Sequence, residues 1–124
     1  MSVHHTDSEA AIQRAVFQHL TLRRVAGVFA FHPPNGGWRS RVEAAILKGL
    51  GVCPGVPDVI AIKDGHAYGL ELKSPAGRLS PAQRDVLAAL RAAGATVSVA
   101  YGLDAALVQL EAWELLRGGG PRNF

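Results

Sequence analysis

The stretch that most constrains the fold is residues 55–73, which read GVPDVIAIKDGHAYGLELK. Two short apolar segments flank Asp64-Gly65, and an Asp-Gly pair between β-forming residues is a strong signal for a two-residue hairpin turn. With that turn, Lys63 faces His66 and the numbers of every facing pair add up to 129. The sequence therefore predicts two neighbouring antiparallel strands in a defined register.

That register sets Asp58 directly opposite Glu71, whereas a three- or five-residue loop would move the two to a near-diagonal. Opposed side chains have Cβ atoms about 4.5–5.5 Å apart, so two carboxylates there repel each other, and burial strengthens the repulsion. Strand alternation puts Lys73 on the face of Glu71, with Leu70 and Leu72 on the other face. A single ammonium group leaves net negative charge, which a divalent cation would remove. Oxygen ligands without His or Cys favour magnesium or manganese over zinc.

A plainer interpretation is that Asp58 caps a turn and that Glu71 and Lys73 form an ordinary surface pair. For an isolated E-x-K in a strand, this interpretation would be favoured. Here the aspartate lies in register, and a capped helix that carries Gln83 follows, so the joint pattern favours a metal site. A cation held there can activate water and stabilise the charge on a phosphate under attack, and Lys73 would orient the water or hold the phosphate.

Helices and strands alternate along the rest of the chain. The predicted elements are a helix from a cap at Asp7 or Ser8 to about Arg24, a strand over 28–32, a short helix from Ser40, the hairpin, a helix opened by Ser80-Pro81-Ala82-Gln83, a strand over 95–102 and a last helix capped by Asp104. This order predicts a three-layer α/β domain in which helices flank a central mixed sheet. One domain would cover residues 1–124, with a core over about 8–116 and a flexible tail over 117–124.

Composition narrows the functional classes. No apolar run approaches the ~18 residues of a membrane span, and the first residues lack the pattern of a secretion signal. The single cysteine, Cys53, excludes an internal disulfide and a Cys-based zinc site, which fits a reducing cytoplasm. Residues 14–48 hold six basic side chains against one acid, Glu43. This local excess favours a polyanion such as nucleic acid, and a merely solvated basic face is an equal alternative.

The combination of GVPD (55–58), ELK (71–73) and GRLSPAQ (77–83) resembles the VRR-NUC domains of the PD-(D/E)XK nuclease superfamily. The segments HPPNGG (32–37) and VSVAYGLDAAL (97–107), with GVCPG before the aspartate, are also similar to small stand-alone, often phage-borne members of that family. The resemblance covers about residues 8–116. It implies the restriction-endonuclease-like fold and metal-dependent hydrolysis of DNA phosphodiester bonds.

The resemblance also implies roles for individual residues. The metal ligands would be Asp58, Glu71 and the backbone carbonyl of Leu72, and Lys73 would be the catalytic lysine. Gln83 would reach the same site from the first turn of its helix. Glu9 would bind a second ion or its water, although the helix dipole alone also favours a glutamate in a first turn.

Five residues are candidate DNA contacts. Glycines let a loop approach a phosphate backbone closely, and arginines are common phosphate ligands. The candidates are Asn35, Gly36, Arg39, Arg41 and Arg78. Arg78 would equally suit an ordinary surface position.

We therefore expect a magnesium- or manganese-dependent DNA endonuclease that needs no small-molecule cofactor. The family resemblance favours a homodimer that cuts branched DNA such as four-way (Holliday) junctions, in DNA repair, in the cytoplasm of a bacterial or phage-infected cell. One alternative is a catalytically silent DNA-binding or assembly module with the same fold. Another is a sequence-specific restriction-type endonuclease.

Overall fold

The computed structural model describes residues 8–34 and 40–118 of the chain. Its elements follow one another as α1 (Glu9–Arg23), β1 (Phe29–Phe31), α2 (Arg41–Gly49), β2 (Val59–Lys63), β3 (His66–Lys73), α3 (Pro81–Ala92), β4 (Thr96–Tyr101) and α4 (Leu103–Ala112). This is the order that the sequence predicts. No helix in the described ranges is long and apolar enough to cross a membrane.

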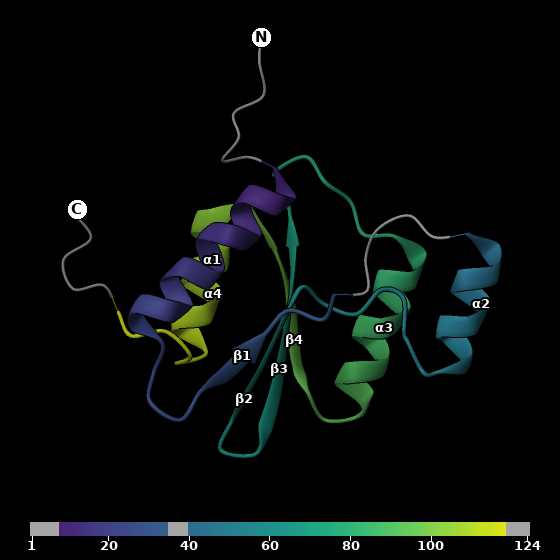
Figure 1. The fold of residues 1–124 in the computed structure, drawn as a ribbon. Helices are drawn as coiled ribbons and strands as arrows, with labels where there is room; N and C mark the ends of the chain where they lie inside the picture. Colours follow the sequence, from purple (N-terminus) through teal and green to yellow (C-terminus); the bar gives the residue numbers. More distant parts are fainter. Residues whose placement is uncertain (1–7, 35–39, 119–124) are drawn as a thin grey trace, which may run out of the picture.

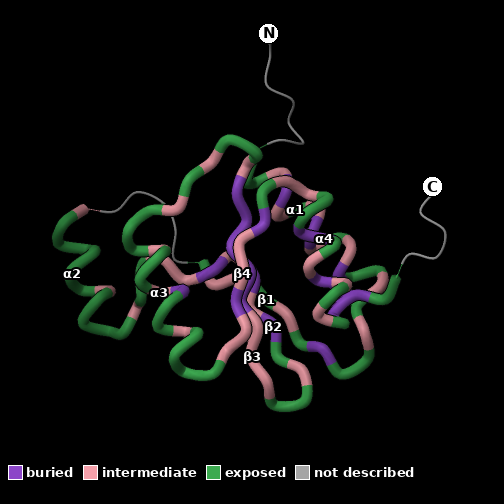
Figure 2. The backbone as a smooth tube through the Cα atoms, turned by 180° about the vertical axis from the view of Figure 1, so that it is seen from behind, coloured by how far each residue is buried: buried purple, intermediate pink, exposed green. Residues whose placement is uncertain are grey.

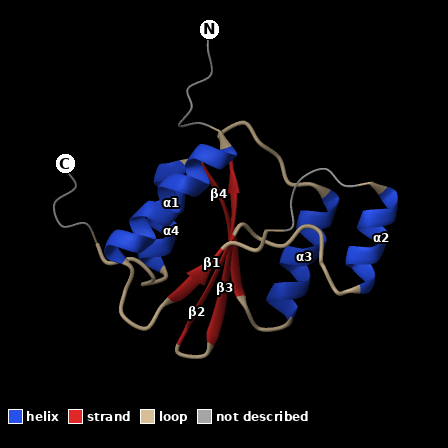
Figure 3. Cartoon of the chain, viewed as in Figure 1, coloured by secondary structure: helices blue, strands red, loops and turns tan. Residues whose placement is uncertain are grey.

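The four strands form one mixed sheet in the order β1-β2-β3-β4. β1 pairs with β2 and β2 pairs with β3 in antiparallel fashion, whereas β4 runs parallel to β3. Helices α1 and α4 cover one face of the sheet, while α3 and, further out, α2 lie on the other side (Figure 1, Figure 3). The predicted three-layer α/β architecture is confirmed.

The hairpin between β2 and β3 has the predicted register. Asp64 and Gly65 both have positive φ, 52° and 74°, as a type I′ turn requires. Pairing runs from Lys63 with His66 to Val59 with Leu70, so each pair adds up to 129 as expected. Asp58 therefore lies one residue before the first pair of β2, and Glu71 follows the last pair on β3.

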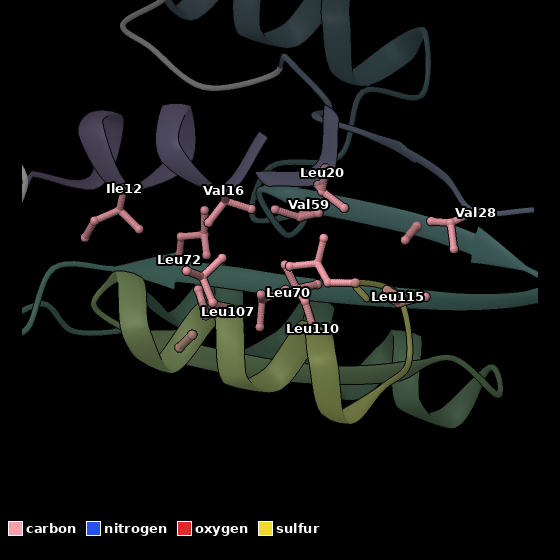
Figure 4. Close-up of a cluster of buried hydrophobic side chains, with 14 residues drawn as sticks. Ile12, Val16, Leu20, Val28, Val59, Leu70, Leu72, Leu107, Leu110 and Leu115 are labelled. Atoms are coloured by element: carbon pink, nitrogen blue, oxygen red, sulfur yellow. The ribbon is translucent and has the colours of Figure 1, made fainter. Parts of the chain in front are cut away.

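The hydrophobic core lies between the sheet and the layer of α1 and α4 (Figure 4). Helix α1 begins after Ser8, whose hydroxyl accepts a hydrogen bond from the Ala11 amide at 3.1 Å. Its buried residues recur every four positions and form one stripe. The stripe and its partners in Figure 4 are Ile12, Val16 and Leu20 against Val59, Leu70, Leu72, Leu107 and Leu110.

Helix α4 begins differently from the prediction. Its N-cap is Gly102, with φ of 94°, and no side chain caps the helix. Asp104, which the sequence suggested as the cap, lies in the first turn instead. Only a residue that tolerates positive φ suits the sharp bend out of β4, where the Gly102 amide donates to the Lys73 carbonyl at 2.9 Å.

Helix α2 is covered by little of the described chain. Ser40 caps it through a bond from the Glu43 amide at 3.1 Å, but none of its residues is buried. Val42 and Ile46 are 69% and 58% exposed, and the burial colouring shows the helix as an exposed element beside α3 (Figure 2). The apolar spacing of this segment therefore produces a helix of which only Leu47 is partly covered by the described chain.

The end of the described chain returns to the end of α1. Arg24 and Leu116 form an isolated antiparallel bridge, and the Arg117 amide donates to the Arg23 carbonyl at 2.8 Å. Arg23 also forms an ion pair of 2.7 Å with Glu111 of α4. Residue 117, where the predicted tail begins, is thus bonded to the core, and residues 119–124 lie outside the described ranges.

Candidate active site

Two acids and a lysine meet where β2 begins and β3 ends. Asp58 immediately precedes β2, while Glu71 and Lys73 lie among the last three residues of β3. The Leu72 amide donates a hydrogen bond of 2.9 Å to Oδ2 of Asp58. Because Leu72 directly follows Glu71 in the chain, this hydrogen bond holds the Asp58 carboxylate against β3, close to Glu71.

The Glu71 carboxylate is oriented by Gln83 of α3. Only 2% of Glu71 is exposed, and its Oε2 accepts a hydrogen bond of 3.1 Å from Nε2 of Gln83. The side-chain Oε1 of Gln83 accepts a hydrogen bond of 2.8 Å from the backbone amide of Ser80. The Ser80 hydroxyl in turn accepts one of 3.1 Å from the backbone amide of Gln83. This capping box fixes which end of the side-chain amide points to Glu71.

Lys73 stands between two acids. Its side chain is 8% exposed, and Nζ lies 3.8 Å from Oε2 of Glu71 and 4.0 Å from Oε1 of Glu9. These distances describe ion pairs and exceed the range of good hydrogen bonds. Glu9 is the first residue of α1 and its side chain is 49% exposed. The first turn of α1 therefore lies close enough to the end of β3 for Glu9 to contact Lys73.

The environment disfavours the charged form of Glu71. Burial, followed by repulsion from Asp58 and hydrogen bonding with it, raises the pKa of Glu71 to about 8, against the weaker opposing effect of Lys73. Its Oε1 is buried without a hydrogen-bond partner in the described structure. Two carboxylates are both acceptors, so they can share a hydrogen bond only when one of them carries a proton. The site therefore calls for a proton or a cation.

A small hard cation fits these donors. The described residues contain no cluster of three or more His, Cys, Asp or Glu side chains that could hold a metal. Magnesium needs no such cluster, because it is commonly bound through one or two carboxylates and keeps several waters. Asp58 and Glu71 supply oxygen ligands only, and Oε1 of Glu71 has no hydrogen-bond partner among residues 8–34 and 40–118. Zinc, which prefers nitrogen and sulfur ligands, suits this site less well.

His32 belongs to the site, although the sequence did not suggest it. Its Nδ1 lies 2.7 Å from the backbone oxygen of Asp58, and since a carbonyl only accepts, Nδ1 is the donor. The contact joins positions 26 residues apart. Because Phe31 pairs with Ile60 in the antiparallel sheet, the next residue, His32, lies close to Asp58. This contact depends on the register between β1 and β2, which the sequence analysis did not predict.

The predicted DNA contacts are only partly described. Arg41 is the first residue of α2, and Arg78 lies in the loop between β3 and α3; both are exposed. No described hydrogen bond or ion pair joins either arginine to the carboxylates. Asn35, Gly36 and Arg39 lie outside the described residues.

Comparison with known proteins gives a consistent result. A family model described as the VRR-NUC domain matches residues 7–104, a range that contains every catalytic and metal-binding candidate. A solved structure described as a VRR_NUC domain protein aligns with a TM-score of 0.68 and 22% sequence identity, over 84% of this chain and 85% of that chain. At this identity the likeness establishes a shared fold. None of the curated proteins matches the chain.

Proposed function

Because the chain belongs to the VRR-NUC domain family, a family of nuclease type, we propose that it is a divalent-metal-dependent DNA endonuclease. The observation that carries this proposal is the pair Asp58 and Glu71. Glu71 is 2% exposed and has a buried oxygen that no group in the described part of the chain contacts by a hydrogen bond. Burial of a carboxylate against another acid costs stability unless a positive charge compensates it. Catalytic sites commonly contain such arrangements.

Asp58, Glu71 and the Leu72 carbonyl would hold the cation. A bound magnesium or manganese ion would supply Lewis-acid stabilisation of the charge on the phosphate under attack. The chain orients the two carboxylates. The backbone amide of Leu72 donates to Asp58 at 2.9 Å, and the side-chain amide of Gln83 donates to Glu71 at 3.1 Å. Positioning of this kind lowers the entropic cost of the reaction.

Lys73 would orient the attacking water or hold the scissile phosphate. Its ammonium group is largely withdrawn from solvent, where an electrostatic contact with a phosphate is worth more than at the surface. In the hydrolysis, the water oxygen bonds to phosphorus and gives up a proton to solvent, while the bond to the leaving sugar oxygen breaks and that oxygen takes up a proton to become a hydroxyl group. Glu9, 4.0 Å from Nζ of Lys73, would bind a second ion or its water.

Duplex DNA would be positioned by electrostatic attraction. The chain carries a formal net charge of +3, and the local excess of basic residues lies in 14–48. The residues that would contact the phosphate backbone are those expected from the sequence: Asn35, Gly36, Arg39, Arg41 and Arg78. Binding that depends on phosphate contacts weakens steeply with salt.

The preferred substrate would be branched duplex DNA, such as a four-way junction, cut by a homodimer. A chain of this size has few elements with which to read a base sequence, so recognition of DNA shape is favoured. The exposed apolar side chains Val42, Ile46 and Leu50, the last 76% exposed, offer α2 as a surface that a second copy would cover. The setting would be DNA repair in the cytoplasm of a bacterial or phage-infected cell.

The proposal is tested by magnesium-dependent nicking of labelled branched and linear DNA. Asp58→Ala and Lys73→Ala should each abolish nicking, whereas Asp85→Ala, an exposed acid on α3, should leave it unchanged. Binding without cutting in either magnesium or manganese would instead support the silent DNA-binding module. Discrete fragments from an unbranched plasmid would support the restriction-type alternative.

A further inference from the structure

We propose that a groove between α1 and the end of β1 binds an unpaired nucleotide of the DNA strand that enters the active site. The groove is open and has a volume of ≈ 650 Å³, within the usual range for small-ligand sites of about 300–1,000 Å³. Ala10, Gln13, Arg14 and Phe17 line it from α1. Ala30 and Phe31 of β1, with His32 directly after that strand, line the other side. This inference rests on the proposed function and adds a subsite to it.

The groove has a small side chain on each side, Ala10 and Ala30, beside the larger rings of Phe17 and Phe31. Ala10 precedes Arg14 by one helical turn, so both belong to the same side of α1. Ala30 lies in the middle of β1, the edge strand of the sheet. Larger side chains at these two alanine positions would take up part of the groove's volume.

The groove borders the active site at two points. His32, one of its lining residues, donates from Nδ1 to the Asp58 carbonyl at 2.7 Å. Ala10 directly follows Glu9, whose carboxylate lies 4.0 Å from Nζ of Lys73. A DNA strand whose phosphate lies at the two acids therefore has the groove as its immediate continuation.

The polar groups of the groove suit a nucleotide. The side chains of Arg14 and Gln13 have no hydrogen-bond or ion-pair partner in the described part of the chain. An uncommitted guanidinium on an exposed position suits a phosphate, and an amide can both donate to and accept from a base edge. The positive charge of Arg14 also complements the charge of the DNA backbone.

An exposed aromatic residue favours an unpaired base over an intact duplex. Phe31 is 40% exposed and lines the groove. Bases stack on aromatic side chains where a strand is single, whereas in a duplex both faces of each base are covered by neighbouring bases. We therefore assign the groove to a flap, gap or frayed end next to the cut, with the base on Phe31 and its phosphate on Arg14.

The test compares two DNA ligands, a duplex with a single-stranded flap and the same duplex without the flap. Affinity is measured by fluorescence anisotropy in EDTA, which prevents metal-dependent cutting. Phe31→Ala and Arg14→Ala should each weaken binding of the flap DNA by about tenfold, within the range reported for loss of a base–aromatic stack or phosphate contact. Binding of the unflapped duplex should change by less than about twofold.

Matched variants separate the groove from general effects. Leu22→Ala removes an apolar side chain that is 76% exposed on α1 but outside the groove, and Arg91→Ala removes an exposed charge from the far end of α3. Both should retain the flap affinity. Phe31→Leu keeps an apolar side chain at the same position and should show the loss expected of a missing stack. A 2-aminopurine base in the flap should be quenched by the natural chain and less so by Phe31→Ala.

Two results would overturn the inference while the proposed function stands. One is an equal loss of affinity for both DNA ligands in Arg14→Ala, with no effect of Phe31→Ala, which would mean that the groove meets a duplex backbone. The other is unchanged flap binding in both variants together with normal magnesium-dependent nicking. A natural chain that neither binds nor cuts either DNA would instead contradict the proposed function itself.

Discussion

Replacement of Glu71 by glutamine should stabilise the metal-free protein and remove its affinity for a divalent cation. The buried Glu71 carboxylate lies beside Asp58 and has one oxygen to which no described residue donates a hydrogen bond. A glutamine has nearly the same shape and no charge. Its carbonyl can keep the bond from Gln83, and its amide group can donate to the Asp58 carboxylate.

The magnitude follows from the raised pKa. Burial and Asp58 raise the pKa of Glu71 from 4.5 to about 8. Because the pKa of Glu71 is raised on folding, the contribution of its protonated form to the free energy of unfolding is fully present below pH 4.5 and is lost as the pH rises towards 8. At about 1.4 kcal/mol per pH unit, Glu71 destabilises the metal-free fold at pH 7 by roughly 3 kcal/mol relative to its value at pH 4.5. The Glu71→Gln protein does not lose this stability, so at pH 7 its Tm should be roughly 10 °C higher than that of the natural chain.

The assay is thermal or urea unfolding of both proteins in EDTA between pH 4.5 and pH 8.5. The difference in free energy of unfolding should be small at pH 4.5 and should grow steadily with pH. Magnesium at pH 7 should then raise the Tm of the natural chain but leave that of Glu71→Gln unchanged, because a ligand stabilises only the form that binds it. Glu43→Gln, at an exposed position of α2, provides the control and should show no pH-dependent difference.

The reasoning would be refuted if Glu71→Gln were less stable than the natural chain at pH 7 in EDTA. A stability difference that stayed constant with pH would refute it equally, since it would show that Glu71 has the same pKa in the folded and unfolded chain.

Three other predictions address the same region. Magnesium affinity, measured by calorimetry, should rise about tenfold per pH unit from pH 6 until it levels off near pH 8, because Glu71 must lose its proton to bind the ion. Gln83→Glu should keep the bond from the Ser80 amide but place a third carboxylate beside Glu71, so it should lower the free energy of unfolding by more than about 1 kcal/mol and lower nicking by at least about tenfold, because Glu71 loses its amide donor. Gly55→Ala should lower the free energy of unfolding by more than about 2 kcal/mol, since φ is +90° and a Cβ would lie 2.6 Å from the Ala82 carbonyl oxygen. Gly49→Ala, where a Cβ meets nothing within 4 Å, should be tolerated.

Local chemistry made the centre of this fold predictable from the sequence. The pair Asp64-Gly65 determines the hairpin turn, and the turn determines the register. The register alone brings Asp58 and Glu71 to the same end of the two strands. The start of α3 was equally accessible, because Ser80 and Gln83 have the spacing of a capping box.

Features that depend on distant parts of the chain could not be predicted. The contact of His32 with Asp58 follows from the way β1 aligns with β2, and no turn sets that alignment. Asp104 has the properties of a helix cap, yet the bend out of β4 requires positive φ at Gly102 and moves the helix start. The apolar spacing of α2 indicates a helix but does not say what covers it.

The side chain of Gln83 takes part in two bonds at once, one to the start of α3 and one to Glu71. Reversal of its amide would place oxygen against oxygen at Glu71 and nitrogen against nitrogen at Ser80, so the two bonds are kept or lost together. Fraying of the first turn of α3 and loosening of the Glu71 carboxylate are therefore a single event. Amide hydrogen exchange at the beginning of α3 should slow when magnesium is added, which makes this helix end a spectroscopic reporter of the site.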